Sequence, residues 1–225
     1  MKDPRAILIT GASSGIGAAL AVAYAAPGRA LFLTGRHETR LASVAGDCRE
    51  RGAAVTSAAL DVTDATALAD WIAAMDAARP LDLVIANAGI SGGTDKAAGG
   101  EDESQARRIF AVNLQGVINT VMPAIAVMRA RGRGQIALMS SLAGFRGFPG
   151  APAYCASKAA VKAWGESLRG SLRGDGIEVS VICPGFVRSP MTDVNPFPMP
   201  LLMETDRAAA LIKRRLARNH GRIAF

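Results

Sequence analysis

The sequence predicts an α/β protein built on a doubly wound parallel β-sheet and folded as one domain over residues 1–225. Short apolar runs alternate with longer helix-like stretches, the pattern of strands joined by crossover helices. Half of the residues are apolar but only 5% are aromatic. The core must therefore consist mainly of Ala, Val, Leu and Ile, as in a parallel sheet covered by helices on both faces. A length of 225 residues suits one such domain.

Seven apolar runs are expected to form the strands, with helices in most of the intervals between them. In chain order the expected strands cover residues 5–10, 30–35, 54–60, 81–87, 134–139, 178–183 and 222–225. Right-handed crossovers between parallel strands place ligands in the crevice beyond the carboxyl ends of the strands. Functional residues are thus expected at or just past the ends of these runs.

A glycine-rich turn follows the first expected strand and precedes an alanine-rich helical stretch over residues 18–26. It reads Thr10-Gly11-Ala12-Ser13-Ser14-Gly15-Ile16-Gly17. Gly11 permits the tight turn, Gly15 lets the backbone approach a pyrophosphate, and Gly17 lets the helix pack against the strand. The helix N-terminus would face the anion. The same turn can also be purely structural, so on its own the motif is weak evidence.

Tyr154 and Lys158 stand four positions apart and follow Ser141 in the sequence. In a helix such a pair lies on one face, so the ammonium would stabilise the phenolate and lower the pKa of the tyrosine. A phenol with an ordinary pKa near ~10 is a poor acid or base at neutral pH, and a lowered pKa brings it into use. Ser141 would give a hydroxyl to the substrate oxygen. Taken alone, the pair is more often an exposed helical contact.

The remaining composition suggests a cytoplasmic protein without a metal site. The first expected strand begins almost at once, which leaves no room for a signal peptide, and no apolar run reaches ~18 residues. Cys48, Cys155 and Cys183 are odd in number and lack metal-ligand spacing, so they are expected to be reduced thiols.

Over essentially its whole length the chain resembles the short-chain dehydrogenase/reductase family, which has a Rossmann fold. The motifs that carry the resemblance occur in the family's order. They are Thr10-Gly11-x-x-x-Gly15-x-Gly17, Asp61-Val62, Asn87-Ala88-Gly89, Asn113, Ser141, Tyr154-x-x-x-Lys158 and Pro184-Gly185. Their joint occurrence by chance is negligible.

The resemblance implies a role for each matching position. Asn113, Ser141, Tyr154 and Lys158 would form the catalytic set, with the Asn113 backbone carbonyl holding a water that links Lys158 to solvent. An asparagine inside a helix is locally unfavourable and often simply points into solvent. The cofactor would be bound by Tyr154 and Lys158 and by the following residues: Gly11, Ser13, Ser14, Gly15, Ile16, Gly17, Arg36, Asp61, Val62, Asn87, Ala88, Gly89, Pro184, Gly185, Val187 and Ser189.

The end of the second strand favours NADP (NADPH) over NAD. NAD sites usually place an acid there to hold the ribose hydroxyls, whereas a nearby arginine accommodates a 2′-phosphate. Here Gly35 occupies the family's usual acidic position and Arg36 follows it. Alternatively, Arg36 stacks on the adenine of either cofactor. Ser14 is an argument against NADP, because some NADP-using relatives carry a second basic residue at that position.

Together these residues predict an NAD(P)-dependent oxidoreductase that interconverts a carbonyl and an alcohol by hydride transfer, with Tyr154 as the acid or base. Tyr154 would protonate the carbonyl oxygen while Ser141 orients it. The alternative is a catalytically silent nucleotide-sensing or scaffold protein of the same fold. Such a protein typically loses one member of the set formed by Ser141, Tyr154 and Lys158, and none is lost here.

Two loops are expected to border the substrate pocket. Residues 145–149 lie between Ser141 and Tyr154, and residues 190–204 contain a Pro-Phe-Pro-Met-Pro-Leu-Leu run from position 196 to 202. The second loop is either an apolar substrate lid or a segment packed on a neighbouring subunit. Both readings suggest a partly apolar substrate, although a small polar one stays open. The family's habit implies a homodimer or homotetramer.

The net charge of +7 is concentrated near the end of the sequence. A helix capped by Thr205 or Asp206 would carry an apolar stripe formed by Ala208, Leu211, Ile212 and Leu216, with its cations on the other face. A solvated surface helix is the simpler interpretation. Peripheral contact with an anionic membrane is the alternative. No nucleic-acid partner is expected, because no recognition module or interleaved aromatic residues accompany the charges.

Overall fold

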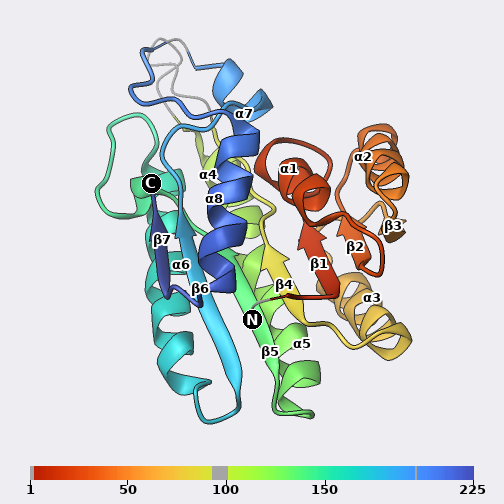
Figure 1. Ribbon diagram of the computed structural model, residues 1–225. Helices are drawn as coiled ribbons and strands as arrows, with labels where there is room; N and C mark the ends of the chain where they lie inside the picture. The colour runs from red at the N-terminus through yellow and green to blue at the C-terminus, as the bar shows by residue number, and fades with distance from the viewer. Residues whose placement is uncertain (1–2, 93–100, 196) are drawn as a thin grey trace.

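The computed structural model describes residues 3–92, 101–195 and 197–225 and contains a single α/β domain (Figure 1). Its centre is a seven-stranded sheet in the order β3-β2-β1-β4-β5-β6-β7, with every neighbouring pair parallel. The strands are β1 Ala6–Thr10, β2 Ala30–Thr34, β3 Ala54–Ala58, β4 Leu83–Ala86, β5 Gly134–Met139, β6 Ile177–Cys183 and β7 Arg222–Ala224. The predicted doubly wound Rossmann fold and all seven expected strands are confirmed.

Two strands begin later than predicted, at points where carboxylate side chains, and not a neighbouring strand, accept hydrogen bonds from the backbone. The carboxylate of Asp82 accepts hydrogen bonds from the backbone N–H groups of Arg5 (2.8 Å) and Ala6 (3.1 Å). In addition, the N–H of Leu81 binds the Asp76 carboxylate at 2.9 Å. These bonds satisfy the backbone just before β1 and β4, so β1 begins at Ala6 and β4 at Leu83. The pattern of apolar residues carries no signal for such side-chain bonds.

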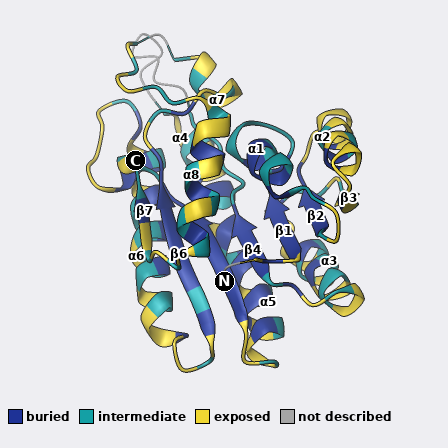
Figure 2. Ribbon diagram, viewed as in Figure 1, coloured by how far each residue is buried: buried dark blue, intermediate teal, exposed yellow. Residues whose placement is uncertain are grey.

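Helices cover both faces of the sheet (Figure 1). One face carries α1 Gly15–Tyr24, α2 Glu38–Glu50 and α8 Thr205–Ala217, and the other carries α3 Ala65–Ala78, α5 Gly116–Arg129 and α6 Pro152–Ser171. Each helical layer forms its own apolar cluster with the sheet. Figure 2 shows the central strands buried and the outer helix faces exposed. Burial on both faces explains why β1, β2, β4 and β5 read as continuous buried runs in the sequence.

One long helical stretch crosses the face opposite α1. It joins α4 Glu103–Phe110, a π-helical turn η2 Ala111–Gln115, and α5. Among the described residues this stretch, Glu103–Arg129, is the one helix long and apolar enough to cross a membrane, and 56% of its most apolar window is buried inside the fold. Burial of that kind is typical of a core helix.

Helix α8 forms as predicted, but its ends and its charges differ from expectation. Its N-cap is Glu204, which makes no side-chain capping bond, and the Thr205 hydroxyl instead donates to the carbonyl of Arg188. Lys213 leaves the solvated face and donates to the carbonyl of Ala23 at the end of α1. The Ala23 carbonyl is an acceptor that α1 leaves without a partner within the helix, so it attracts the ammonium.

The apolar stripe of α8 is used within the fold. Ala208, Ile212 and Leu216 are buried, and Leu211 packs against the same cluster. None of the large apolar side chains of α8 is exposed. The apolar stripe of α8 is therefore occupied within the fold, and the alternative of membrane contact would depend on the cations of the helix.

The packing of α8 can be tested by a matched pair of Leu→Ala changes. Leu216 is 1% exposed and Leu201 is 96% exposed. Leu216→Ala should lower the free energy of unfolding by about 2–5 kcal/mol, because it opens a cavity in the core. Leu201→Ala should change it by less than about 0.5 kcal/mol. Urea denaturation of the three proteins measures both values, and equal effects of the two substitutions would show that α8 is not docked.

Candidate active site

Residues predicted to be functional meet at the edge of the sheet where the strands end. Arg36 comes after β2, Asp61 after β3, Asn87 after β4, Ser141 after β5 and Pro184 after β6. The glycine loop comes after β1. Because all strands are parallel, their carboxyl ends lie along one edge of the sheet (Figure 1). The predicted convergence of these segments is confirmed.

The glycine loop is shaped by close backbone contacts. Gly11 has φ +67°, and a Cβ there would lie 2.7 Å from the Cα of Ala88. A Cβ on Gly17 would lie 2.3 Å from the carbonyl oxygen of Gly11. Larger residues therefore do not fit at either position. Helix α1 begins at Gly15, and its N-cap Ser14 makes no side-chain capping bond. The first-turn N–H groups thus form the kind of cradle that holds a pyrophosphate.

Thr10 and Asn87 lock the glycine loop to the end of β4. The side-chain amide of Asn87 donates to the carbonyls of Thr10 (3.0 Å) and Gly11 (3.2 Å). In return, the Thr10 hydroxyl accepts from the N–H groups of Asn87 (3.1 Å) and Ala88 (3.2 Å). Sequence reasoning did not assign Thr10 a role. Its position as the last residue of a strand before a glycine turn was the available signal.

Arg36 lies beside Asp61 at the outer end of this edge. The guanidinium is 3.8 Å from the carboxylate, and both side chains are partly exposed. Burial raises the pKa of Asp61, but hydrogen bonds from Thr63 and the charge of Arg36 outweigh it, so the net pKa is lowered. A Cβ on Gly35 would lie 3.1 Å from the Ser13 hydroxyl oxygen. Gly35 therefore lies against the Ser13 hydroxyl and is followed by Arg36.

Val62 is held by the long helix on the other face. Buried Asn119 donates its side-chain N–H to the carbonyl of Val62 at 2.9 Å. A Cβ on Gly116 would lie 2.5 Å from a Val62 methyl group, so the helix approaches closely only because this residue is glycine. Asn119 was missed by sequence reasoning, which had no reason to separate it from other polar helix residues.

Ser141 begins a short 3₁₀ turn, η3 Leu142–Gly144, directly after β5. Its hydroxyl accepts from the N–H of Ala143 (3.1 Å) and donates to the carbonyl of Pro184 (3.3 Å). Leu142 also donates to the carbonyl of Pro184, at 2.9 Å. The ends of β5 and β6 are thus joined at Ser141. The Ser141 side chain also lies near enough to the phenol of Tyr154 to act toward lowering its pKa.

Tyr154 and Lys158 lie on one face of α6, as their spacing predicts. The Lys158 ammonium is 5.8 Å from the centroid of the Tyr154 ring. Lys158 is 3% exposed, and its Nζ donates to the carbonyl of Met139, at the end of β5, at 3.0 Å. Burial lowers the pKa of Lys158 to about 8.

The pKa of Tyr154 differs from the sequence expectation. Desolvation of the phenol raises it, and the hydrogen bond with Ser141 only partly opposes this rise. The sequence predicts that Lys158 lowers the pKa of Tyr154, but in the cofactor-free protein this pKa is raised. The reason is that the ammonium faces the carbonyl of Met139 and is itself desolvated, so burial is the larger effect on both groups.

Asn113 lies in the π-helical turn and not in a regular α-helix. It is fully buried, which excludes the solvent-facing alternative. Its side-chain oxygen accepts from the N–H of Ile90 (2.8 Å), and its amide donates to the carbonyl of Ile90 (2.9 Å) and to Ser157 (3.3 Å). A Cβ on Gly89 would lie 3.3 Å from both Asn113 Oδ1 and Lys158 Nζ, so the three residues adjoin. Such π turns occur frequently at functional sites.

The segment after β6 brings Ser189 to the glycine loop. A Cβ on Gly15 would lie 3.1 Å from the Ser189 Cβ. Ser189 is the N-cap of α7, Pro190–Asp193, and forms a capping box with Thr192. Thr192 also donates to the carbonyl of Val187 at 2.9 Å. Gly185 is fixed from the other side, because its N–H donates to the carbonyl of Phe225 at 2.7 Å.

Comparison with known proteins decides the family. The family model described as short chain dehydrogenase matches residues 5–196 of the sequence. The chain belongs to the short-chain dehydrogenase family. It is 42% identical over 222 residues to an uncharacterized oxidoreductase of Myxococcus xanthus, covering 98% of this chain and 87% of that protein. It is accordingly an NAD(P)-dependent oxidoreductase.

Two solved structures have the same fold as this dehydrogenase. A short-chain dehydrogenase from Sphingobium yanoikuyae in complex with NADPH has a TM-score of 0.86 and 27% identity, covering 97% of this chain and 87% of that one. A short chain dehydrogenase from Mycobacterium paratuberculosis bound to NAD has a TM-score of 0.84 and 24% identity, covering 100% and 97%. The second likeness concerns the fold alone.

Glu101 is a further residue of the dehydrogenase site that sequence reasoning missed. One carboxylate oxygen accepts from the N–H of Ala153 at 2.5 Å and the other from the N–H of Tyr154 at 3.2 Å. Glu101 thereby caps the first turn of α6, where Ala151, the N-cap, gives no side-chain bond. It is distant in sequence from the helix it caps, so no local motif could have revealed it.

The burial of Lys158 predicts a specific dependence of stability on pH. Its pKa is about 8 in the folded protein and 10.5 as the ordinary value. Between these values the folded state binds fewer protons than the unfolded state, so the free energy of unfolding rises with pH. The cost of burying the charge, about 3 kcal/mol, is present in full below the lower value and is relieved as pH approaches the higher one.

Lys158→Met should therefore be more stable than wild type at pH 7, and its advantage should shrink by roughly 2–3 kcal/mol by pH 10. Groups common to both proteins cancel in this difference. Urea denaturation of the cofactor-free proteins at the two pH values measures it. A difference that does not change with pH would show that the lysine titrates normally.

Proposed function

We propose that this dehydrogenase interconverts a carbonyl and an alcohol by hydride transfer, with Tyr154 as the proton donor or acceptor and NADPH as the preferred cofactor. The observation that carries the proposal is the placement of Tyr154 beside the buried ammonium of Lys158 on one face of α6, with the Ser141 side chain near enough to lower the pKa of the phenol. These groups lie at the same sheet edge as a glycine cradle that has no room for side chains. A proton donor and a dinucleotide cradle at one edge are the parts that the reaction needs.

The protein's own groups have separate tasks in the reaction. When bound, the nicotinamide cofactor supplies the hydride that reduces the carbonyl carbon, or accepts it in the reverse direction. The phenol O–H of Tyr154 breaks as its proton passes to the carbonyl oxygen. The Ser141 hydroxyl, which donates to the carbonyl of Pro184 in this structure, would turn to donate a hydrogen bond that orients this oxygen. The Lys158 ammonium stabilises the phenolate that is left. Hydride plus proton converts C=O to CH–OH, so atoms and charge balance.

The residues at the sheet edge fit a dinucleotide. The glycine loop would hold the pyrophosphate at the start of α1, Asp61 and Val62 the adenine, and the segment from Asn87 to Gly89 the ribose. Because the Asn87 amide already binds the carbonyls of Thr10 and Gly11, we infer that it shapes this part of the site and offers backbone groups to the cofactor. Val187 and Ser189 would face the carboxamide.

The preference for NADPH is supported by the residues around Arg36. An acid after β2, which would repel a 2′-phosphate, is replaced by Gly35, and the Ser13 hydroxyl lies beside that position. The guanidinium of Arg36 is partly exposed, and its ion pair with Asp61 is a long one of 3.8 Å. An exposed pair of this kind is weak, so Arg36 is free to bind a phosphate.

We propose that the substrate is partly apolar beside its carbonyl group, with residues 190–204 as a lid. Residue 196 of this loop lies outside the described residues. The base of the loop is closed, because Arg188 and Met203 are hydrogen-bonded at 3.0 Å and Met203 donates to the carbonyl of Phe186 at 2.9 Å. Val194 and Leu201 are exposed on this loop. Phe148 is exposed on the other expected pocket loop, residues 145–149. The cytoplasmic location and a homodimer or homotetramer stay predictions.

Replacing the proton donor tests the reaction. Tyr154→Phe should lower the rate of NADPH oxidation with aldehydes, ketones and diketones by at least about 10²-fold, because the proton donor is lost. Cofactor affinity should stay close to that of wild type, since the ring is kept. Turnover is followed by NADPH absorbance and binding by calorimetry. Unchanged turnover in the variant would overturn the mechanism, and absent turnover in wild type would favour the nucleotide-sensing alternative.

Replacing Arg36 tests the choice of cofactor. Arg36→Ala should weaken NADPH binding by about tenfold, the loss of one charge-assisted contact, and leave NADH binding nearly unchanged. Arg51→Ala is the matched control, because it removes an exposed cation at the far end of α2. Titrating both cofactors into the three proteins measures the effect. Equal affinities of wild type for NADH and NADPH would contradict the preference.

A further inference from the structure

A cavity lies at the opposite edge of the sheet from Ser141 and Tyr154. Its volume is about 400 Å³, and it opens between the end of α1 and the second half of α8. Pro4 lies just before β1 and Arg29 directly before β2, so the cavity is at the edge where the strands begin. A volume of this size is within the range of small-molecule sites. It is separate from the cofactor edge.

The cavity is strongly cationic. Its lining includes Arg29, Lys213 and Arg214 and, among the described residues, no carboxylate. Arg29 uses part of its guanidinium on the carbonyl of Tyr24 (3.0 Å) and pairs with Asp3 at 2.8 Å. Lys213 uses one of its three donors on the carbonyl of Ala23. Arg214 is exposed. More positive charge and more N–H donors are therefore present than the surrounding protein consumes.

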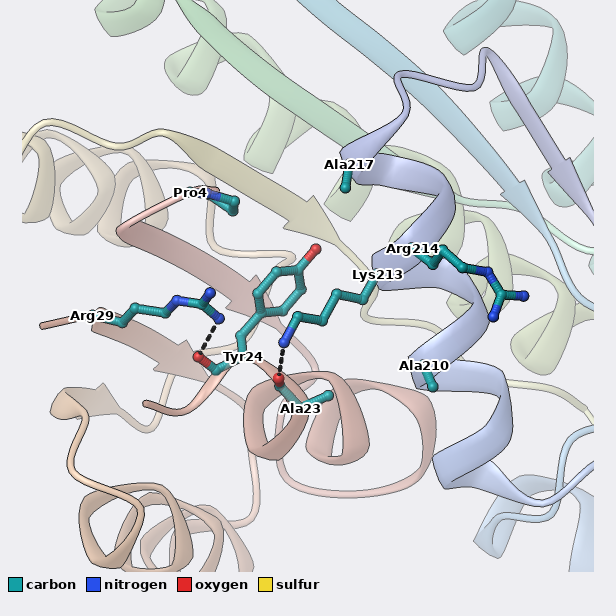
Figure 3. Close-up of a pocket in the computed structure, with 8 residues that line it drawn as sticks. All are labelled: Pro4, Ala23, Tyr24, Arg29, Ala210, Lys213, Arg214 and Ala217. Carbon is teal, nitrogen blue, oxygen red and sulfur yellow. Dashed lines mark hydrogen bonds between the residues drawn. The ribbon is translucent and has the colours of Figure 1, made fainter. Parts of the chain in front are cut away.

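The side chain of Tyr24 is the least explained group in the cavity. Tyr24 is 2% exposed, and within the part of the chain that the structure describes its hydroxyl has no hydrogen-bond partner. Figure 3 shows the ring between Arg29 and Lys213, with the hydroxyl pointing away from α1 toward the space between Pro4 and Ala217. The hydroxyl is therefore open to the cavity and can donate to an acceptor placed there.

Two cationic side chains lie close to the ring of Tyr24. Lys213 Nζ is 5.2 Å and Arg29 Cζ 5.9 Å from the centroid of the Tyr24 ring. Burial and then the charge of Arg29 lower the pKa of Lys213, with Asp3 acting in the opposite direction. An anion placed between these two like charges beside the buried ring would reduce the repulsion between them.

The rest of the wall is apolar and small. Pro4, Ala23, Ala210 and Ala217 line it, and none of them bears a side-chain polar atom. A bare inorganic anion would leave this surface unused. An organic anion with a compact apolar body would cover it while its charged end meets the cations and the phenol.

We propose that this cavity is a binding site for a small organic carboxylate. The Tyr24 hydroxyl donates to one carboxylate oxygen, Lys213 provides the charge, and the apolar body lies on the alanine and proline wall. A carboxylate suits the site better than a phosphate, because Arg29 is already shared with Asp3 and the walls are mostly apolar.

The competing explanation is that the cations merely neutralise the end of α1. Arg29 and Lys213 do bind its last carbonyls, and cations are favourable at that end of a helix. Helix capping does not account for the unpaired Tyr24 hydroxyl or for Arg214. The two explanations differ in whether Tyr24 and Lys213 contribute to the affinity for an added anion.

Calorimetric titration with sodium benzoate, with benzyl alcohol as the uncharged counterpart, tests the proposal. We expect one benzoate site in the wild-type protein and at least about tenfold weaker binding of the alcohol. Tyr24→Phe should weaken benzoate by about tenfold, because it removes one hydrogen bond to a charged group. Lys213→Met should weaken it at least as much. Arg218→Met, which removes an exposed cation of the same helix end outside the cavity, should leave it unchanged.

Equal benzoate affinity in wild type, Tyr24→Phe and Lys213→Met would overturn the proposal, because binding would then be elsewhere, including the substrate pocket. Absence of binding below about 10 mM in wild type would also overturn it. Tyr24→Phe keeps the ring and both ring–cation contacts, so it remains decisive if Lys213→Met fails to fold.

Discussion

The burial of one lysine ammonium governs the arrangement of the catalytic edge. Lys158 is 3% exposed and meets the carbonyl of Met139 at 3.0 Å, so a charge is held where water is scarce. That is costly unless neighbours compensate, and here the neighbours include the carbonyl of Met139 at the end of β5 and the phenol of Tyr154 on α6. Keeping α6 close enough requires small residues: a Cβ on Gly144 would lie 2.8 Å from the Lys158 carbonyl oxygen, and the Ser140 hydroxyl donates to the same oxygen at 2.7 Å.

The neighbouring elements support α6 in the same way, through polar groups that join segments distant in sequence. The π-helical turn lets Asn113 bridge Ile90 and Ser157, and Ser157 in turn donates to the carbonyl of Tyr154 at 2.8 Å. Glu101 caps the first turn of α6. Tyr154, the proposed proton-transfer group, is therefore held by segments distant in sequence, which is how a preorganised site reduces the cost of reaching the transition state.

Sequence reasoning recovered the seven strands along the chain, the sheet edge where the site lies and the residues that gather there, because these depend on apolar periodicity and on motifs that are local in sequence. It could not recover the π turn at Asn113, the cap provided by Glu101 or the bonds of Thr10, because each joins residues that are brought together only by the tertiary fold. The pKa of Tyr154 was expected to fall and is raised, because spacing reveals that a lysine is near and says nothing about how strongly both groups are desolvated.

A tyrosinate absorbance titration tests this view of the site most directly. The chain has two tyrosines, and burial raises the pKa of Tyr24, so tyrosinate formed near or below pH 10 reports Tyr154 alone. We expect the cofactor-free protein to show little tyrosinate up to pH 10.0, the ordinary pKa of a tyrosine phenol. With saturating NADP⁺, whose nicotinamide is cationic, one tyrosine should titrate below that value and this titration should be lost in Tyr154→Phe. Identical curves with and without NADP⁺ would contradict Tyr154 as the proton-transfer group.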